Sequence, residues 1–575
     1  MKSKTSFFNP TIFKKDVTRF APAWGLYSLM LVLYLLMTGN FTLYSRAVSV
    51  ADMIGPYATV MGCYALIVVQ LLFGDLYNPR MCNAIHAMPP RRECLFVTHV
   101  AAGLAFALVP NAVITLVSMP LLGGAWSVAA WWLLGTTLEY LFFFGLALFC
   151  AMCVGNRFAM ALVYGIINFL SMLAYWFVDT LYEPLLTGVR FLSDPFIRFC
   201  PFVQMCNSHQ LVDVLVVKSL DQDGTYVFSY NEIDQIVIGE GWSYLAICAV
   251  IGAVLVGLAL LLYRRRKLES AGDFMAVRVM EPVFLVLYTL TFGCLLHLCR
   301  TLFGVGSGNE YWFLAIGIAA GFFTGLMLLR RTTRVFRPKA FLGLGVLGAV
   351  VALSLVLTSM DVLGITRIVP DKSEIASIRF GESYSYNSFY LGSEVKVTDE
   401  ADFDNILYVH RYGIGEITEN LEIEGDTLCL TDVGIEYTLT DGTILNRYYS
   451  IPVPSTAGRI LGDYYSRPEV VLDVEVPLEE LADRIYYIAC DSADGHTGDG
   501  GLDAQSLIDA IIADCEAGNM IQLWEYQNQS GTTEYTRWLN LDYRTEDGEI
   551  GTTIRVFDSC ENTLRWLVEN GLTTP

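Results

Sequence analysis

Residues 243–267 read SYLAICAVIGAVLVGLALLLYRRRK, in which twenty-one uncharged and mostly apolar residues precede four consecutive basic ones. A helix needs about 20 apolar residues to cross the ~30 Å hydrocarbon layer of a membrane. Lys and Arg gather in the loops on the cytoplasmic side. The stretch therefore predicts a membrane-spanning helix that ends in the cytoplasm.

Apolar runs of this kind recur along the first 359 residues. They lie at 23–43, 57–74, 95–121, 129–153, 158–178, 243–263, 282–299, 311–329 and 341–359. Each run predicts one span. The expected fold class is a polytopic all-α membrane protein with about nine transmembrane helices, followed by a C-terminal soluble α+β domain.

The basic residues orient these helices. With the N-terminus in the cytoplasm, 19 Lys and Arg fall on the cytoplasmic side and five on the outer side. The densest groups are 264–267 and 330–339. An odd number of spans then puts the C-terminal domain outside, so we expect a multi-pass protein of the cell (plasma) membrane with an extracellular domain.

Charge divides the chain near residue 360. Residues 1–359 carry 24 basic and 18 acidic residues, whereas residues 360–575 carry 13 and 40. Such an acidic domain is a poor partner for nucleic acid or anionic lipid, and it is long enough to bury its own core. We expect it to fold separately from the helices.

Local patterns in the acidic domain predict both strands and helices. Two alternating runs flank Asp441-Gly442, which predicts a hairpin over 435–449. Residues 502–517 and 562–569 have helical spacing, and 551–556 reads as a strand. No internal repeat is visible in the sequence.

The cysteine and acidic residues bear on possible metal and disulfide sites. The chain has 14 Cys without a Cys/His metal spacing, and four of them lie in the acidic domain: Cys429, Cys490, Cys515 and Cys560. Their irregular spacing argues against a disulfide framework, although two bridges are possible in an extracellular domain. The Gly-rich stretch 498–501 lacks the spacing of a calcium loop, so no metal or other cofactor is expected in this chain.

The segment before the first span and the long segment after the fifth have their own patterns. Asn9-Pro10 predicts an N-cap and first turn, and 1–22 reads as a cytoplasmic elbow helix with an apolar face opposite Lys14, Lys15 and Asp16. The outer segment 179–242 mixes aromatic and acidic residues. It is either partly re-entrant or interfacial, or an ordinary loop.

The loop 75–94 contains start and stop signals for a short, stiff helix. Asn78-Pro79 begins it and Pro89-Pro90 ends it, with Met81, Ile85 and Met88 on one stripe. Basic residues flank both ends, which suits transmission of force to another protein; the alternative is that they only enforce topology. The residues assigned to coupling are Pro79, Arg80, Ile85, His86, Met88, Pro89, Arg91, Arg92 and Glu93.

With this loop, a basic elbow helix and six spans, residues 7–263 resemble the permease subunits of type-2 ABC exporters of bacteria. The resemblance implies a six-helix permease domain over 23–263, and a coupling helix within 79–93 that docks on an ABC ATPase. It also implies a second permease copy or a paralogue. The three additional helices over 264–359 and the domain 360–575 depart from that plan.

No Walker A sequence occurs in the chain, so no phosphate-cradling loop is available for ATP hydrolysis. We expect ATP and Mg²⁺ in the partner subunit and no enzyme activity in this one. The expected function is export of peptides, lipids or amphiphilic drugs by alternating access. The alternative is a non-transporting membrane sensor, whose extracellular domain binds a ligand or envelope component.

Two features inside the spans draw attention. Glu139 is an ionisable residue in an apolar run, which predicts a place on the transport path or, alternatively, a protonated packing role; His99 reads as interfacial. Gly317, Gly321 and Gly325 are spaced four apart, which allows close helix approach, within the chain or between copies.

Overall fold

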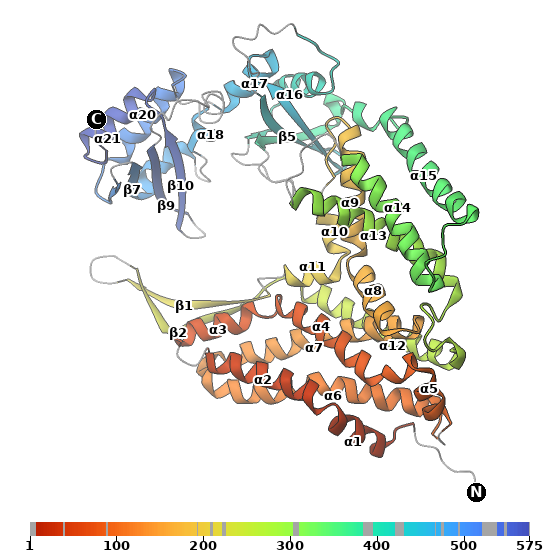
Figure 1. The fold of residues 1–575 in the computed structure, drawn as a ribbon. Coiled ribbons are helices and arrows are strands. Elements are labelled where there is room, and N and C mark those ends of the chain that lie inside the picture. Colours follow the sequence, from red (N-terminus) through yellow and green to blue (C-terminus); the bar gives the residue numbers. More distant parts are fainter. Residues whose placement is uncertain are drawn as a thin grey trace. The chain divides into compact units, whose positions relative to one another are not determined.

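The computed structural model describes residues 7–37, 41–87, 90–191, 194–207, 211–220, 226–302, 310–382, 395–419, 430–465, 467–472, 477–492, 495–519, 537–545 and 549–573. The chain forms two compact units. The first contains residues 1–177 and 193–350, and the second contains 178–192 and 351–575. The division places the start of the predicted outer segment with the C-terminal domain. Figure 1 shows the elements of both units.

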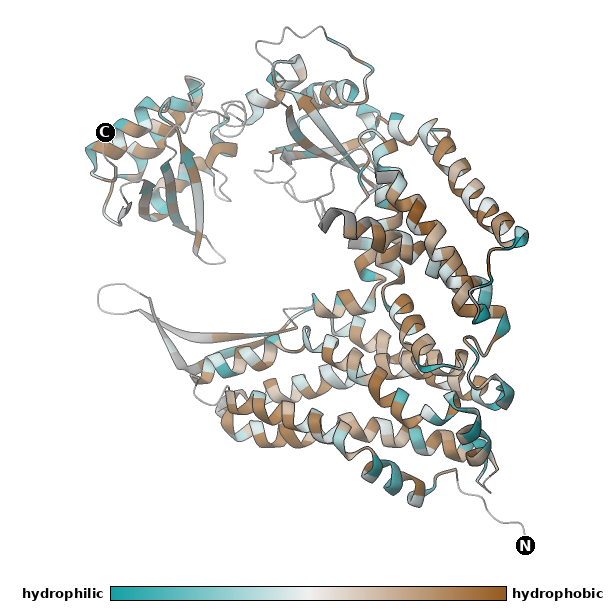
Figure 2. Cartoon of the chain, viewed as in Figure 1, coloured by the Kyte–Doolittle hydropathy of each residue, from teal (hydrophilic) through white to brown (hydrophobic). Residues whose placement is uncertain are grey.

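The first unit is built mainly from helices. Their bounds are α1 Pro10–Arg19, α2 Ala21–Met37, α3 Leu43–Asp52, α4 Tyr57–Leu72, α5 Pro79–His86, α6 Arg92–Ser118, α7 Trp126–Cys153, α8 Arg157–Asn168, α9 Leu170–Tyr182, α10 Asp194–Arg198, α11 Pro201–Cys206, α12 Trp242–Arg265, α13 Glu281–Leu302, α14 Glu310–Arg330 and α15 Pro338–Ser359. Within the described residues, six helices are long and apolar enough to cross a membrane, and nine spans result if three bent pairs are counted. Figure 2 shows their hydrophobic character.

The bent pairs correct part of the expected helix plan. Residues 158–178 were predicted as one helix, but α8 and α9 meet at an angle of 63°. Asn168, at the break, has its carbonyl oxygen 3.1 Å from the Cys200 sulfur, which donates to it from a segment distant in sequence. A side chain that takes a helical carbonyl in this way is a recognised cause of a sharp bend.

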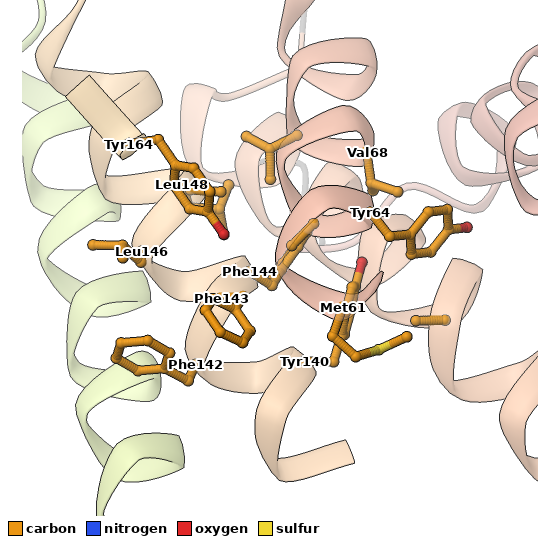
Figure 3. Close-up of a cluster of buried hydrophobic side chains, with 14 of the residues drawn as sticks. Met61, Tyr64, Val68, Tyr140, Phe142, Phe143, Phe144, Leu146, Leu148 and Tyr164 are labelled. Atoms are coloured by element: carbon orange, nitrogen blue, oxygen red, sulfur yellow. The ribbon is translucent and has the colours of Figure 1, made fainter. Parts of the chain in front are cut away.

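Helix α7 forms the centre of the first unit. It packs on α4 and α12, and Tyr140, Phe143 and Phe144 are fully buried. Figure 3 shows these rings beside Met61 and Tyr64 of α4. At the crossing with α12, a Cβ placed on Gly145 would lie 2.2 Å from the carbonyl oxygen of Gly252, so this approach requires glycine.

The predicted outer segment contains a β-hairpin that was not among the expected elements. Strands β1 Val212–Leu220 and β2 Tyr226–Ile238 pair as an antiparallel hairpin that packs along α3. This part of the segment is therefore regular structure and not a loop. Valine repeats in β1 and isoleucine in β2, and Asp223-Gly224 lies between the strands, so the sequence contains a hairpin signal that the prediction did not use.

The second unit contains two four-stranded antiparallel sheets of identical plan. Strands β3 Ile375–Glu382, β4 Val395–Val397, β5 Leu430–Leu439 and β6 Ile444–Pro452 alternate with helices α16 Glu400–Gly413 and α17 Thr456–Tyr465. Strands β7 Ile485–Ser492, β8 Gly495–Asp499, β9 Arg537–Arg544 and β10 Glu549–Val556 follow the same order with α20 Ala504–Glu516 and α21 Glu561–Glu569. Short helices α18 Pro468–Leu472 and α19 Leu478–Arg484 lie between them.

These halves form a structural repeat of the order ββαββα, which is not visible as a repeat in the sequence. In each sheet the second strand of the half lies at one edge, and the first, third and fourth strands follow in that order. Both sheets also have a register shift just after the first residue of the first strand. Matched core positions differ in residue type: Phe380 corresponds to Cys490, and Tyr437 to Leu541. The predicted hairpin, strand and two helices of this region are confirmed.

Candidate functional site

Helix α5 is the short helix expected in the loop 75–94. The Asn78 side chain accepts a hydrogen bond of 3.0 Å from the Arg80 amide, and Pro79 occupies the first turn. The helix ends at His86. Met88 and Pro89 lie outside the described residues, as does the side chain of His86. An N-cap and a proline in the first turn account for the sharp start of this helix.

The buried face of α5 differs from the predicted stripe. Cys82 is buried and Ile85 half-buried, whereas Met81 and Arg80 are exposed. Cys82 and Ile85 are three residues apart, so the inward face is rotated by one residue from the stripe that included Met81. The helix thus leaves an apolar and a basic side chain on its free side.

The residues after α5 join this loop to the end of α12. Arg91 is exposed and extended, and it immediately precedes α6. The Arg92 guanidinium donates to the Arg266 carbonyl oxygen at 3.2 Å. Glu93 pairs with Arg264, with 3.2 Å between Oε1 and Nε. Arg92 and Glu93 therefore fix the loop to the end of α12, whereas the side chains of Arg80 and Arg91 remain exposed.

Arg266 makes contacts that its sequence context, a run of basic residues, indicates only as a topology signal. Its guanidinium donates to the carbonyl oxygens of Ala151 and Met152, at 2.9 and 3.4 Å, and of Leu76, at 3.3 Å. One side chain thus connects α12, the end of α7 and the entry to α5. Three consecutive arginines gave no sign of which one turns inward.

Glu139 is fully buried in α7, and neither carboxylate oxygen has a hydrogen-bond partner within the described residues. The Tyr27 and Tyr57 hydroxyls lie within electrostatic range of it and bond to each other at 3.1 Å. Tyr27 also donates to Asn111 at 2.5 Å. A polar group without partners is costly to bury, and a charged one far more so. Glu139 is therefore a carboxyl group that the described residues do not compensate.

Asp16 corrects one expectation. It was placed on the exposed face of the elbow helix, but it is buried, and its Oδ2 lies 2.7 Å from His99 Nδ1. His99 thus contacts a carboxylate of α1. The Asn9 amide also donates to the Thr98 hydroxyl at 3.1 Å. Both contacts tie α1 to α6.

The glycine stripe of α14 lies against α13. Added Cβ atoms would lie 2.9 Å from Gly293 Cα at Gly317, and 2.8 Å from Phe292 Cβ at Gly321. At Gly325 the nearest atom would be a Leu285 methyl at 2.9 Å. This face of α14 is occupied within the chain.

Cysteine and acidic side chains of the C-terminal domain form no cluster of ligands. Cys490, Cys515 and Cys560 are free thiols, and Cys429 lies outside the described residues. Across the described parts of the chain, no three His, Cys, Asp or Glu side chains gather as they would around a metal ion. Of the predicted Gly-rich stretch, Gly498 belongs to β8. Comparison with known proteins adds no assignment, because no family model, curated protein or solved structure matches this chain.

Proposed function

We propose that this chain is the permease subunit of an ATP-driven exporter in a bacterial cell membrane. About nine spans, with the N-terminus in the cytoplasm, form the transport domain, and the acidic domain is extracellular. An ABC ATPase binds ATP and Mg²⁺, and a second permease copy or a paralogue completes the assembly. The cargo is a peptide, lipid or amphiphilic drug, moved by alternating access.

The arrangement around α5 carries this proposal. The helix is capped at its start, exposes Met81 and Arg80, and is fixed to the ends of α7 and α12 through Arg266. A displacement of α5 by a bound partner would therefore reach both helices. Exposed basic residues suit an acidic partner surface, and an exposed methionine suits an apolar pocket.

Helix α7 links this loop to the candidate transport path. Its C-terminal end accepts the hydrogen bonds from Arg266, and Glu139 lies farther along the same helix. A buried carboxyl group that has no hydrogen-bond partner among the described residues supports a role in which water or cargo supplies the partner. Motion of α7 is thus the proposed connection between ATP hydrolysis and cargo.

The test is the double variant Arg80→Glu/Arg91→Glu. Arg92 is left intact because it contacts the Arg266 carbonyl, so its loss would disturb the fold. We expect normal insertion into the membrane, loss of the co-purifying ATPase and loss of cargo-stimulated hydrolysis. Arg334→Glu/Arg337→Glu changes two exposed arginines elsewhere and serves as the control. If hydrolysis and co-purification survive in the first variant, α5 does not couple the subunits.

The second candidate is a membrane sensor without transport. One observation favours it: residues 183–190 pack on the C-terminal domain, where the Tyr448 amide donates to the Gly188 carbonyl at 3.1 Å. A ligand bound to the domain could then act on the segment that continues from α9. Absence of any co-purifying ATPase from the wild-type protein would favour the sensor.

A further inference from the structure

A polar cavity of about 580 Å³ lies where α12, α13 and α14 meet the loop 266–280. Five basic residues line it: Arg265, Arg266, Lys267, Arg278 and Arg331. Three acidic residues line it as well: Glu269, Asp273 and Glu281. The excess of positive charge indicates a cavity suited to an anionic group. Arg80, Met81 and Glu139 do not line this cavity.

Four of the five cations have no partner in the described parts of the chain. Arg266 is committed to three backbone carbonyls. Arg265, Lys267, Arg278 and Arg331, here called the basic pocket, are exposed and make no side-chain hydrogen bond or ion pair with described residues. Like charges gathered around one cavity repel, and an anion between them removes that repulsion.

Arg331 occupies a backbone conformation that favours glycine. It follows the last residue of α14 and has a φ of +52°. Glycine commonly stands at this position after a helix, because side chains are strained there. A Cβ added to Gly272 would lie 3.8 Å from the Arg331 Nη2, so the guanidinium reaches the loop that forms the cavity. An arginine kept in a strained conformation and without a partner points to a ligand.

Backbone contacts fix the loop that forms the cavity to the segment 153–155. The Gly272 amide donates to the Gly155 carbonyl at 2.7 Å, and the Ala276 amide donates to the Cys153 carbonyl at 2.8 Å. A Cβ at Gly155 would lie 2.2 Å from the Ser270 carbonyl oxygen, so this contact requires glycine. The loop backbone that carries part of the basic pocket is therefore arranged in advance, which lowers the cost of ordering it on binding.

We propose that the basic pocket binds a phosphate group, supplied by the headgroup of a membrane phospholipid. An arginine guanidinium can donate two parallel hydrogen bonds to the oxygens of one phosphate group. Basic pockets between spanning helices on the cytoplasmic side suit lipid headgroups. Leu262, Phe274 and Leu329 add an apolar wall for the start of an acyl chain. The three carboxylates can accept hydrogen bonds from the alcohol or ammonium part of the headgroup. The lipid source rests on the proposed membrane topology, whereas the phosphate site does not.

The experiment measures thermal unfolding of the purified full chain in a maltoside detergent. Three probes are added: dioctanoyl phosphatidylglycerol, inorganic phosphate, and dioctanoylglycerol, which has no phosphate. We expect phosphatidylglycerol to raise the unfolding temperature with saturation. Arg331→Gly and Arg278→Gln should each weaken that binding at least tenfold. Arg331→Gly also relieves the backbone strain, so its ligand-free unfolding temperature should not fall.

The control variant Arg334→Gln/Arg337→Gln removes two exposed cations that do not line the cavity, and it should bind as the wild type does. Arg278→Lys should restore part of the binding, because lysine keeps the charge. A response to inorganic phosphate would support the phosphate site but assign it to a soluble ligand. An equal response to dioctanoylglycerol, or an unchanged response in Arg331→Gly and Arg278→Gln, would overturn the proposal. Neither result depends on ATPase binding, so failure here is distinct from failure of the exporter proposal.

Discussion

His410 is buried in the first half of the C-terminal domain, and its Nδ1 lies 3.0 Å from the Tyr437 hydroxyl. Burial, with Arg447 and Arg411 nearby, lowers its pKa to about 3. The histidine of the unfolded chain takes up a proton near pH 6.5, and the folded one does not. Stability is therefore unaffected above pH 6.5 and falls as the pH decreases from 6.5 toward 3.

This gives a prediction for acid stability. Each pH unit below 6.5 should cost the domain up to about 1.4 kcal/mol. The variant His410→Gln cannot titrate, so its unfolding temperature should change less between pH 7 and pH 5 than that of the wild type. Thermal unfolding of both full-length proteins over this range checks it. Equal slopes would mean that His410 does not remain neutral in the fold.

Glu139 gives the second prediction at this scale. Glu139→Met removes a buried carboxyl group without partners and keeps most of the side-chain volume. The unfolding temperature should rise, since an orphan buried polar group costs roughly 1–3 kcal/mol. Cargo-stimulated hydrolysis of the assembled complex should fall. Leu134→Met, an exposed position on the same helix, should change neither quantity. A fully active Glu139→Met complex would reduce Glu139 to a packing residue.

Single residues were the least predictable part of the candidate site. An ionisable residue in an apolar run is visible in the sequence, so Glu139 was found. Arg266 and the Asp16–His99 pair were not, because nothing local says which arginine of a cluster turns inward or which acid meets a histidine 83 positions away. Such contacts depend on helix packing, which the sequence pattern does not specify.

At the scale of elements, substitution in the glycine stripe of α14 tests whether the stripe serves packing within the chain or association between copies. Gly321→Ala would place a Cβ 2.8 Å from Phe292 Cβ on α13. Overpacking of this kind costs roughly 1–3 kcal/mol, so the unfolding temperature should fall. A Cβ added at Gly348 on α15 would have no atom within 4 Å, so Gly348→Ala should leave the unfolding temperature unchanged or slightly higher. A changed oligomeric state with unchanged stability in Gly321→Ala would instead indicate dimerisation through the stripe.

The segment that follows α9 gives the fourth prediction. Gly188 has a φ of +74°, and an added Cβ would lie 2.2 Å from the Tyr449 ring. Arg190 stacks on the Tyr448 ring, with its Cζ 3.5 Å from the ring centroid. Gly188→Ala should therefore release the segment and speed tryptic cleavage after Arg190 in the purified protein.

The matched control is Gly364→Ala, whose φ of +64° is also unusual but which has open space around it. It carries a similar backbone cost without the steric clash. Equal cleavage rates in the two variants would show that backbone strain, and not contact with Tyr449, controls release of the segment.

Elements with strong periodicity were predicted well, and the reason is physical. A long apolar run or an Asp-Gly turn determines its own local structure. The bend between α8 and α9 involves a contact with Cys200, distant in sequence, so it was missed. The hairpin β1–β2 is local, and its Asp223-Gly224 signal was overlooked. The apolar stripe of α5 was visible in the sequence, but the pattern did not show that Cys82 rather than Met81 would be buried, because the packing partner was unknown.

At the scale of the whole molecule, the repeat in the C-terminal domain was hidden by substitution. The two halves share strand order and register but place different residues at matched core positions, such as Tyr437 and Leu541. A core accepts such exchanges when total volume and pattern are kept. The change of charge near residue 360 was visible in the sequence. The solvent around a domain determines its overall composition, and not the residue at any single position.

The last prediction concerns topology, on which the exporter and the lipid site both draw. Helix α15 has 22 residues, long enough to cross a membrane, and exposes Leu342, Val346 and Val350. Arg337 precedes it and Asp509 follows in the C-terminal domain, both on exposed surface. Gly498 is unsuitable for a label, since a Cβ there would lie 2.4 Å from the Tyr487 hydroxyl.

We expect a membrane-impermeant maleimide to label Asp509→Cys in intact cells, and to label Arg337→Cys only after lysis. The background must lack native cysteines, because Cys63 and Cys299 are exposed. In the proposed topology the basic residues before α15 stay on the cytoplasmic side, because moving them through the hydrocarbon layer is costly, and the helix itself carries the chain outward. Labelling of Arg337→Cys in intact cells would place the basic pocket on the outer side and remove α5 from reach of any ATPase. Labelling of both positions in intact cells would mean that α15 lies along the membrane surface instead of crossing it.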